Sequence, residues 1–156
     1  MRALLFSFLV ELFWLLLMAG FSYACIFPIN GIIAQQFLLI NVVLALLVAY
    51  YFRLVIFFRQ IFYLKFLVIQ VFLFFTNPLL FFKAIGKMQE MLYLFDSHDL
   101  YYFISPDSKA SAYGMNEAYH LYRNEFLLFS VGLLILLSLS EMRIVLAFVE
   151  RIKKME

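Results

Sequence analysis

Five polar side chains recur at regular intervals within an otherwise apolar stretch of the chain, residues 52–77. They are Arg53, Gln60, Tyr63, Gln70 and Asn77, at spacings of 7, 3, 7 and 7 residues. On one continuous α-helix of 3.6 residues per turn, these positions drift slowly around a single side. Because polar groups that face lipid are costly, this side is expected to face protein or trapped water.

Two kinds of chemistry fit such a polar side. It is either a helix–helix seam joined by hydrogen bonds or one wall of a proton or ion path. Two charged residues extend the same interpretation: Glu11 lies in the first apolar stretch, and Lys65 lies about 15 Å from either end of its expected span. The candidate residues for a proton path or helix seam are therefore Glu11, Arg53, Gln60, Tyr63, Lys65 and Gln70.

No pattern of residues points to catalysis or to a metal site. Cys25 is the only cysteine, which excludes an internal disulfide and a cysteine-ligated cluster. The two histidines, His98 and His120, are too few and too far apart to define a metal site. The sequence lacks G-x-G-x-x-G, P-loop and H-E-x-x-H motifs. We therefore expect no catalytic residue, no directly bound cofactor and no metal.

The composition predicts a membrane protein. Of the 156 residues, 67% are hydrophobic, and only 14% are charged where about 25% is usual in soluble domains. A soluble fold of this length cannot bury so much apolar surface. The net charge of +2 is too small to suggest nucleic acid as a partner. The expected fold class is all-α, a polytopic transmembrane protein in one domain with four to five membrane-embedded helices.

Apolar stretches and turn signals give the expected elements. Spans are predicted at about residues 3–27, 32–52, 54–76 and 124–148, with a short or interfacial helix at 79–95 and a polar loop at 96–122. The first span is longer than the apolar core of a signal peptide, so we expect it to be retained. The loop is acidic and the C-terminal tail is basic, which predicts that the two lie on opposite sides of the membrane.

Three sets of residues invite comparison with a known family. They are the turn Phe27-Pro28-Ile29-Asn30, the third-span residues Gln60, Tyr63, Val71-Phe72-Leu73-Phe74-Phe75 and Asn77, and the last-span residues Gly114, Tyr119, Tyr122, Phe126, Ser130-Val131-Gly132-Leu133-Leu134 and Ile144-Val145-Leu146-Ala147. Together with the chain length and the long loop before the last span, they resemble subunit 6 of mitochondrial NADH dehydrogenase, respiratory complex I. Where the family has a glycine two residues after the tyrosine of its third span, this chain has Lys65.

The resemblance implies a multi-pass subunit in the membrane arm of a proton-pumping NADH:ubiquinone oxidoreductase of the mitochondrial inner membrane. Such a subunit is non-catalytic by itself and helps couple quinone reduction to proton translocation. Ubiquinone, NADH, FMN and the iron–sulfur clusters are bound by other subunits. The implied partners are other membrane subunits of the complex and lipids.

Two other functions remain open. Glu11 in the first span and Arg123-Asn124 before the last span resemble the endoplasmic-reticulum proteins associated with the B-cell receptor, which implies a transport or chaperone adaptor. The other alternative is a structural accessory subunit of another inner-membrane complex.

The resemblance also gives specific roles to two candidate residues. Tyr63 is expected at the gate of a charge path, and Lys65 is expected to face a carboxylate of a neighbouring subunit. The alternative is that Tyr63 is a packed aromatic residue and that Lys65 extends its amine to the membrane interface.

Overall fold

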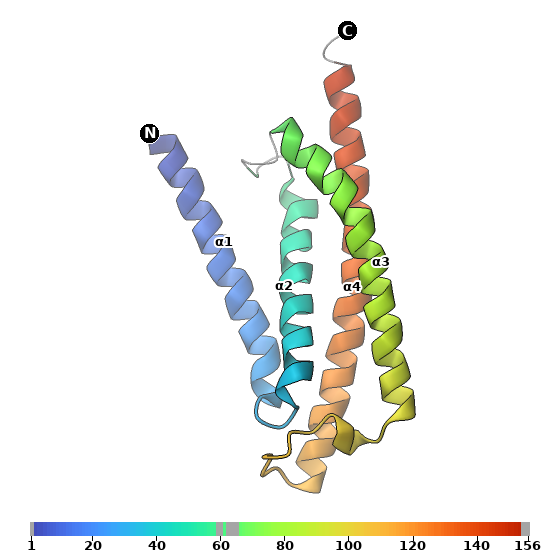
Figure 1. Ribbon diagram of the computed structural model, residues 1–156. Helices are drawn as coiled ribbons and strands as arrows, with labels where there is room; N and C mark the ends of the chain where they lie inside the picture. Colours follow the sequence, from blue (N-terminus) through green and yellow to red (C-terminus); the bar gives the residue numbers. More distant parts are fainter. Residues whose placement is uncertain (1, 59–60, 62–65, 154–156) are drawn as a thin grey trace.

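The computed structural model describes residues 2–58, 61 and 66–153, with side chains from residue 9 onward (Figure 1). This part of the chain is an all-α, polytopic fold. Its four helices that are long and apolar enough to cross a membrane are Leu9–Ile29, Gln35–Phe57, Leu67–Ser97 and Ala112–Ile152. The predicted fold class and the membrane character are therefore confirmed.

The helices run alternately up and down. Helix α1 spans Arg2–Ile26 and continues into the short 3-10 helix η1, Phe27–Ile29. Helix α2, Gln35–Phe57, returns beside it, followed by α3, Leu67–Ser97, and α4, Ala112–Ile152. The start of α1 and the end of α4 lie at one end of the bundle, here called the terminal end. The connections that follow η1 and α3 lie at the opposite end, here called the loop end (Figure 1).

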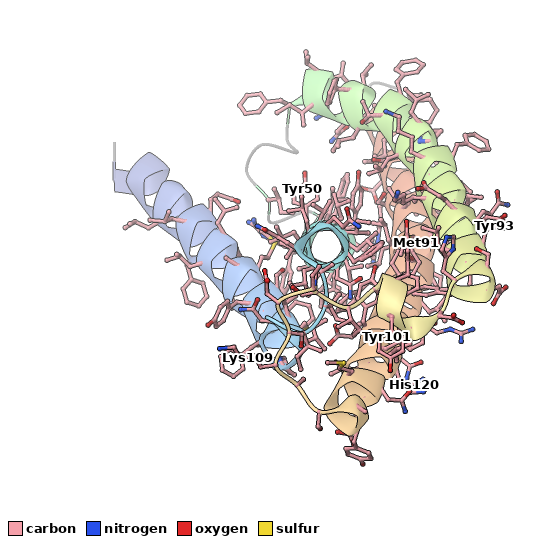
Figure 2. The ribbon with its side chains drawn as sticks, turned by 60° about the horizontal axis from the view of Figure 1, so that its bottom comes forward. Tyr50, Met91, Tyr93, Tyr101, Lys109 and His120 are labelled. Atoms are coloured by element: carbon pink, nitrogen blue, oxygen red, sulfur yellow. The ribbon has the colours of Figure 1, made fainter. Side chains whose placement is uncertain are left out.

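Helix α2 is the centre of the bundle. Figure 2 looks almost along its axis from the loop end, with α1 on one side and α3 and α4 on the other. Buried residues follow its length, including Phe37, Asn41, Ala45 and Leu54. Helix α1 packs against α2 near the loop end and leans away from it toward the terminal end (Figure 1).

The helix bounds differ from the expected spans in the middle of the chain. Helix α2 continues through residues 52–57, where a boundary was expected, and α3 begins only at Leu67. The expectation of one helix across residues 52–77 is therefore wrong. Arg53 belongs to α2, whereas Gln70 and Asn77 belong to α3, which runs in the opposite direction.

The segment at 79–95, expected as a short or interfacial helix, is part of α3. Pro78 lies inside α3 and does not end it. Proline lacks a backbone N–H and commonly bends a helix without stopping it. In Figure 1 the first turns of α3 lean away from the rest of the helix, toward the terminal end of α2.

Helix α4 begins ten residues earlier than the polar loop was expected to end. The Ser111 hydroxyl accepts a hydrogen bond from the Gly114 N–H at 3.2 Å, which caps the first turn. Ala118, Tyr119 and Tyr122 then lie buried at helical spacing, so packing stabilises these first turns of α4. The polar connection is accordingly short, residues 98–111.

The two connections at the loop end are joined to each other. The Ala34 N–H donates to the Phe103 carbonyl, and the Ser105 N–H donates to the Ile32 carbonyl, both at 2.8 Å. Gly31 makes the turn before this contact with a φ of 76°, a conformation that glycine adopts without strain. This pairing fixes the α3–α4 connection against the α1–α2 connection.

Six buried rings, here called the aromatic cluster, lie directly inside these connections. Phe103 is fully buried at their centre, with ring centroids 4.9 Å from Phe37 and 5.1 Å from Phe95. The members are Phe37, Phe95, Phe103, Tyr119, Tyr122 and Phe126. Just above them on α3, Met91 points inward and is fully buried, whereas Tyr93 points outward and is 70% exposed (Figure 2).

Candidate functional site

An ion pair joins α1 to α2 inside the apolar bundle. Arg53 Nη1 lies 2.6 Å from Glu11 Oε2, and the Arg53 side chain is only 5% exposed. The guanidinium also lies 5.4 Å from the ring centroid of Trp14, whose ring packs against Phe57. A charge within a membrane bundle is tolerated when a partner neutralises it, so Glu11 is the counter-charge of Arg53.

Asn77 joins three helices through its side-chain amide. The Tyr51 hydroxyl of α2 donates to Asn77 Oδ1 at 2.9 Å. Asn77 Nδ2 donates to the Ser140 hydroxyl of α4 at 2.9 Å and to Glu141 Oε2 at 3.2 Å. Asn77 is 2% exposed and Ser140 is fully buried. Because these groups are buried, their hydrogen bonds to one another contribute to helix association.

The ion pair and the Asn77 hydrogen bonds lie at one depth in the bundle. Arg53 and Tyr51 are two residues apart on α2, so their side chains point about 200° apart. Helix α2 thus presents Arg53 to α1 and Tyr51 to α3. We call the six residues the polar layer: Glu11, Arg53, Tyr51, Asn77, Ser140 and Glu141.

A second polar contact lies closer to the loop end. Asn41 Nδ2 donates to Glu125 Oε2 at 3.4 Å, and Asn41 is fully buried. Asn41 lies ten residues before Tyr51 on α2, which is about 15 Å along the axis. The buried α2 residues between them, Leu44 and Ala45, are apolar. The polar layer therefore extends in the plane of the bundle and does not continue through it toward Asn41.

Both ends of the polar layer reach the surface of the bundle. The Glu11 side chain is 26% exposed on the α1 side. At the other end, Glu141 is partly exposed beside a cavity of about 220 Å³ between α3 and α4. Asn77, Phe81 and Phe82 line the same cavity. The carboxylates at the two ends of the layer are therefore partly accessible from outside the bundle.

The structure brings together only some of the candidate residues. Glu11 and Arg53 form a direct pair, and Gln70 is buried on α3 two turns before Asn77. Gln60, Tyr63 and Lys65 lie outside the described residues. The single polar side across residues 52–77 does not exist, since Arg53 and Asn77 reach the layer from two different helices.

The sequence reasoning missed Tyr51, Ser140 and Glu141 in the layer, and Asn41 and Glu125 in the second contact. Glu125 and Glu141 did carry a usable signal, because a carboxylate within an expected span needs a polar partner. Ser140 carried none, since a serine in a helix usually bonds to its own backbone, as Ser138 does here.

The arrangement provides hydrogen bonding and charge compensation. Among the described residues, no group of three histidine, cysteine or acidic side chains is placed to hold a metal ion. The cavity of about 420 Å³ between α1 and α2 is lined mainly by apolar residues such as Ile26, Leu38 and Val42. Comparison with protein families, curated proteins and solved structures found no match for this chain.

Proposed function

We propose that the protein is a non-catalytic membrane-arm subunit of a proton-pumping NADH:ubiquinone oxidoreductase. In this role it helps to couple quinone reduction to proton translocation in the mitochondrial inner membrane. The observation that carries the proposal is the polar layer, which crosses all four helices at one depth. A subunit that relays charge between neighbours in the membrane needs polar contacts in the plane of the bilayer.

The chemistry of the layer supports electrostatic coupling. Glu11 and Arg53 form its charged end, and Glu141 is the ionisable group at its other end. Between them, the Tyr51 hydroxyl donates to Asn77, whose amide does not readily carry a proton. Because Arg53 and Tyr51 point to opposite sides of α2, a change of charge at one end acts on the other through its electric field in a medium of low dielectric constant.

The exposed apolar surface supports the subunit role. Side chains such as Phe13, Leu16, Phe82 and Leu128 are 61–71% exposed, which suits contact with lipid or other membrane subunits. In the proposed complex, NADH, FMN, the iron–sulfur clusters and ubiquinone are bound by other chains. The four-helix bundle itself supports neighbouring membrane subunits and provides charged groups, Glu11 and Glu141, for contact with them.

The identity of the complex is tested by native purification. The chain carries a C-terminal tag, membranes are solubilised in a mild detergent, and the co-purified proteins are identified by mass spectrometry. Core subunits of NADH dehydrogenase are the expected result. Secretory or receptor-transport partners contradict the proposal and favour the adaptor alternative. Subunits of a different inner-membrane complex favour the accessory role.

The role of the layer is tested in the intact complex with Glu141→Gln. This change keeps the size of the side chain and its hydrogen bond but removes the charge, so we expect normal assembly and fewer protons pumped per quinone reduced. The matched control is Glu117→Gln, which alters an exposed carboxylate at the start of the same helix. Wild-type pumping stoichiometry in Glu141→Gln would reduce the layer to a helix seam.

A further inference from the structure

A cationic groove lies on the bundle between α2, α3 and α4. It encloses about 300 Å³ and is lined by aliphatic side chains of α2, among them Val43 and Leu47, and by Leu133 of α4. Two lysines of α3, Lys83 and Lys87, line it as well. The groove therefore combines an apolar floor with positive charge.

One of the two lysines is already neutralised. Lys87 Nζ lies 2.7 Å from Glu90 Oε1, an ion pair one turn apart on α3. Lys83 is exposed and has no hydrogen bond or ion pair to any residue within the described ranges. Of the remaining acidic residues of the chain, only Glu156 lies outside those ranges. One uncompensated positive charge remains in the groove, at Lys83.

Lys83 lies beside the middle part of α2, the helix at the centre of the bundle. The α2 residues that line the groove run from Leu39 to Leu47, and their centre, Val43, is 8 residues from Gln35 (43 − 35) and 14 residues from Phe57 (57 − 43). These separations are about 12 and 21 Å, so the groove lies within the length of a candidate membrane span and away from both of its ends. Side chains on a helix point toward its N-terminus, so the Lys83 amine is directed further from the loop end.

We propose that a transmembrane helix of a partner protein, with one aspartate or glutamate near its midpoint, docks in the cationic groove and pairs this carboxylate with Lys83. A lysine on the membrane-spanning part of a bundle requires a counter-charge at its own depth. A phospholipid head group lies near the membrane surface, about 15 Å from the bilayer centre, and does not reach that depth.

The groove also restricts which residue types the partner helix can carry on either side of its carboxylate. Its floor is aliphatic, so the flanking positions of the partner are expected to be apolar. Because Lys87 and Glu90 compensate each other, the groove provides for one carboxylate and no more. A second acidic residue one turn away on the partner would lack a counter-charge.

The test uses the full chain in phosphatidylcholine vesicles, labelled with a fluorescence acceptor at its C-terminus. The probe is a synthetic leucine- and alanine-rich transmembrane peptide of about 24 residues with one central glutamate and a donor dye. The matched peptide carries glutamine instead. We expect the wild-type chain to bind the glutamate peptide about tenfold more tightly than the glutamine peptide, as measured by energy transfer.

Variants assign the effect to Lys83. Lys83→Met should abolish the preference for the glutamate peptide, and Lys83→Glu should instead prefer a peptide with one central lysine. This reversal also excludes loss of folding as the cause. The control Lys87→Met/Glu90→Gln removes the neighbouring pair as a unit and should keep the preference.

Three results would overturn the proposal. The first is equal affinity of the wild-type chain for the glutamate and glutamine peptides. The second is an equal loss of preference in the Lys87→Met/Glu90→Gln control. The third is competition by anionic lipid, seen as release of the glutamate peptide when phosphatidylglycerol replaces part of the phosphatidylcholine, which would assign the groove to a lipid.

Discussion

The two ends of the bundle are held together by different forces. At the loop end, six rings of the aromatic cluster pack around Phe103, and the two connections close over them through backbone hydrogen bonds. Toward the terminal end, the helices diverge, and the contacts of the polar layer join them (Figure 1). The loop end is complete within the chain, whereas the layer extends to the surface at Glu11 and Glu141.

The two ends of the bundle therefore contribute differently to folding stability and to the choice of one helix arrangement. Close packing of large rings holds the loop end through many weak contacts that need no second chain. Polar pairs inside a membrane add less net stability, but they allow only one arrangement of donors and acceptors. We therefore expect mutations in the aromatic cluster to cost more folding stability than mutations in the polar layer.

The largest effect is expected for Phe103→Ala. The ring is fully buried and contacts rings from α2, α3 and α4, so its removal leaves a cavity and should cost about 3 to 5 kcal/mol. Unfolding by sodium dodecyl sulfate in mixed micelles, followed by circular dichroism, measures the change. The control Tyr101→Ala removes a ring that is 72% exposed and should have little effect. Similar losses for both would mean that the loop end is not closely packed.

Next in size is Glu11→Gln, which leaves the buried Arg53 without its counter-charge. We expect a loss of up to about 3 kcal/mol, since Trp14 still faces the guanidinium. The double variant Glu11→Gln/Arg53→Met removes both charges and should recover much of that loss in the same unfolding assay. If the double variant is as unstable as the sum of its two single variants, the two residues are not coupled.

Asn77→Leu should cost about 2 kcal/mol, because it removes the hydrogen bonds that join α3 to α2 and α4. The neighbouring control is Thr76→Val. The Thr76 hydroxyl bonds only to carbonyls of its own helix, so its loss should be close to neutral. If Asn77→Leu and Thr76→Val cost the same stability, the hydrogen bonds of Asn77 do not help to hold the helices together.

The smallest effect is expected for Ser140→Ala, about 0.6 kcal/mol. Ser140 and Ser138 both donate to a carbonyl of α4, but only Ser140 also accepts a hydrogen bond from Asn77. Ser138→Ala is thus a matched control for the shared backbone bond. A double-mutant cycle of Ser140→Ala with Asn77→Leu should give a coupling of the same size, and a coupling of zero would contradict the contact.

The fold class followed from the sequence because hydropathy reports how much of a chain belongs in a membrane. Hydropathy does not report where an apolar stretch turns. Residues 52–77 contain no proline or glycine, so nothing local predicted the end of α2 at Phe57 or the start of α3 at Leu67. At Pro78 the sequence predicted a helix boundary where none exists. Proline is a strong local signal for a helix end, but α3 continues through it because the helix is packed on both sides of this residue.

The polar site was predicted in part for the same reason. Glu11 and Arg53 were recognised because charges in apolar stretches need an explanation. Their pairing was not predicted, because helical periodicity relates residues on one helix and contains no information on contacts between helices. Tyr51, Asn77 and Ser140 meet only through the order and direction of three helices.

The Glu11–Arg53 pair has a consequence for biosynthesis. Its two residues lie on consecutive helices, so both charges can enter the membrane in a single hairpin, already neutralised. Asn77 has no such advantage, since Ser140 is 63 residues later in the chain. At about 5 to 20 residues per second, the ribosome needs on the order of ten seconds to reach it. The first hairpin is thus ready for the bilayer early. Asn77 Oδ1 also finds its donor, Tyr51, on the preceding helix, whereas Asn77 Nδ2 must wait for the last helix to supply its acceptors.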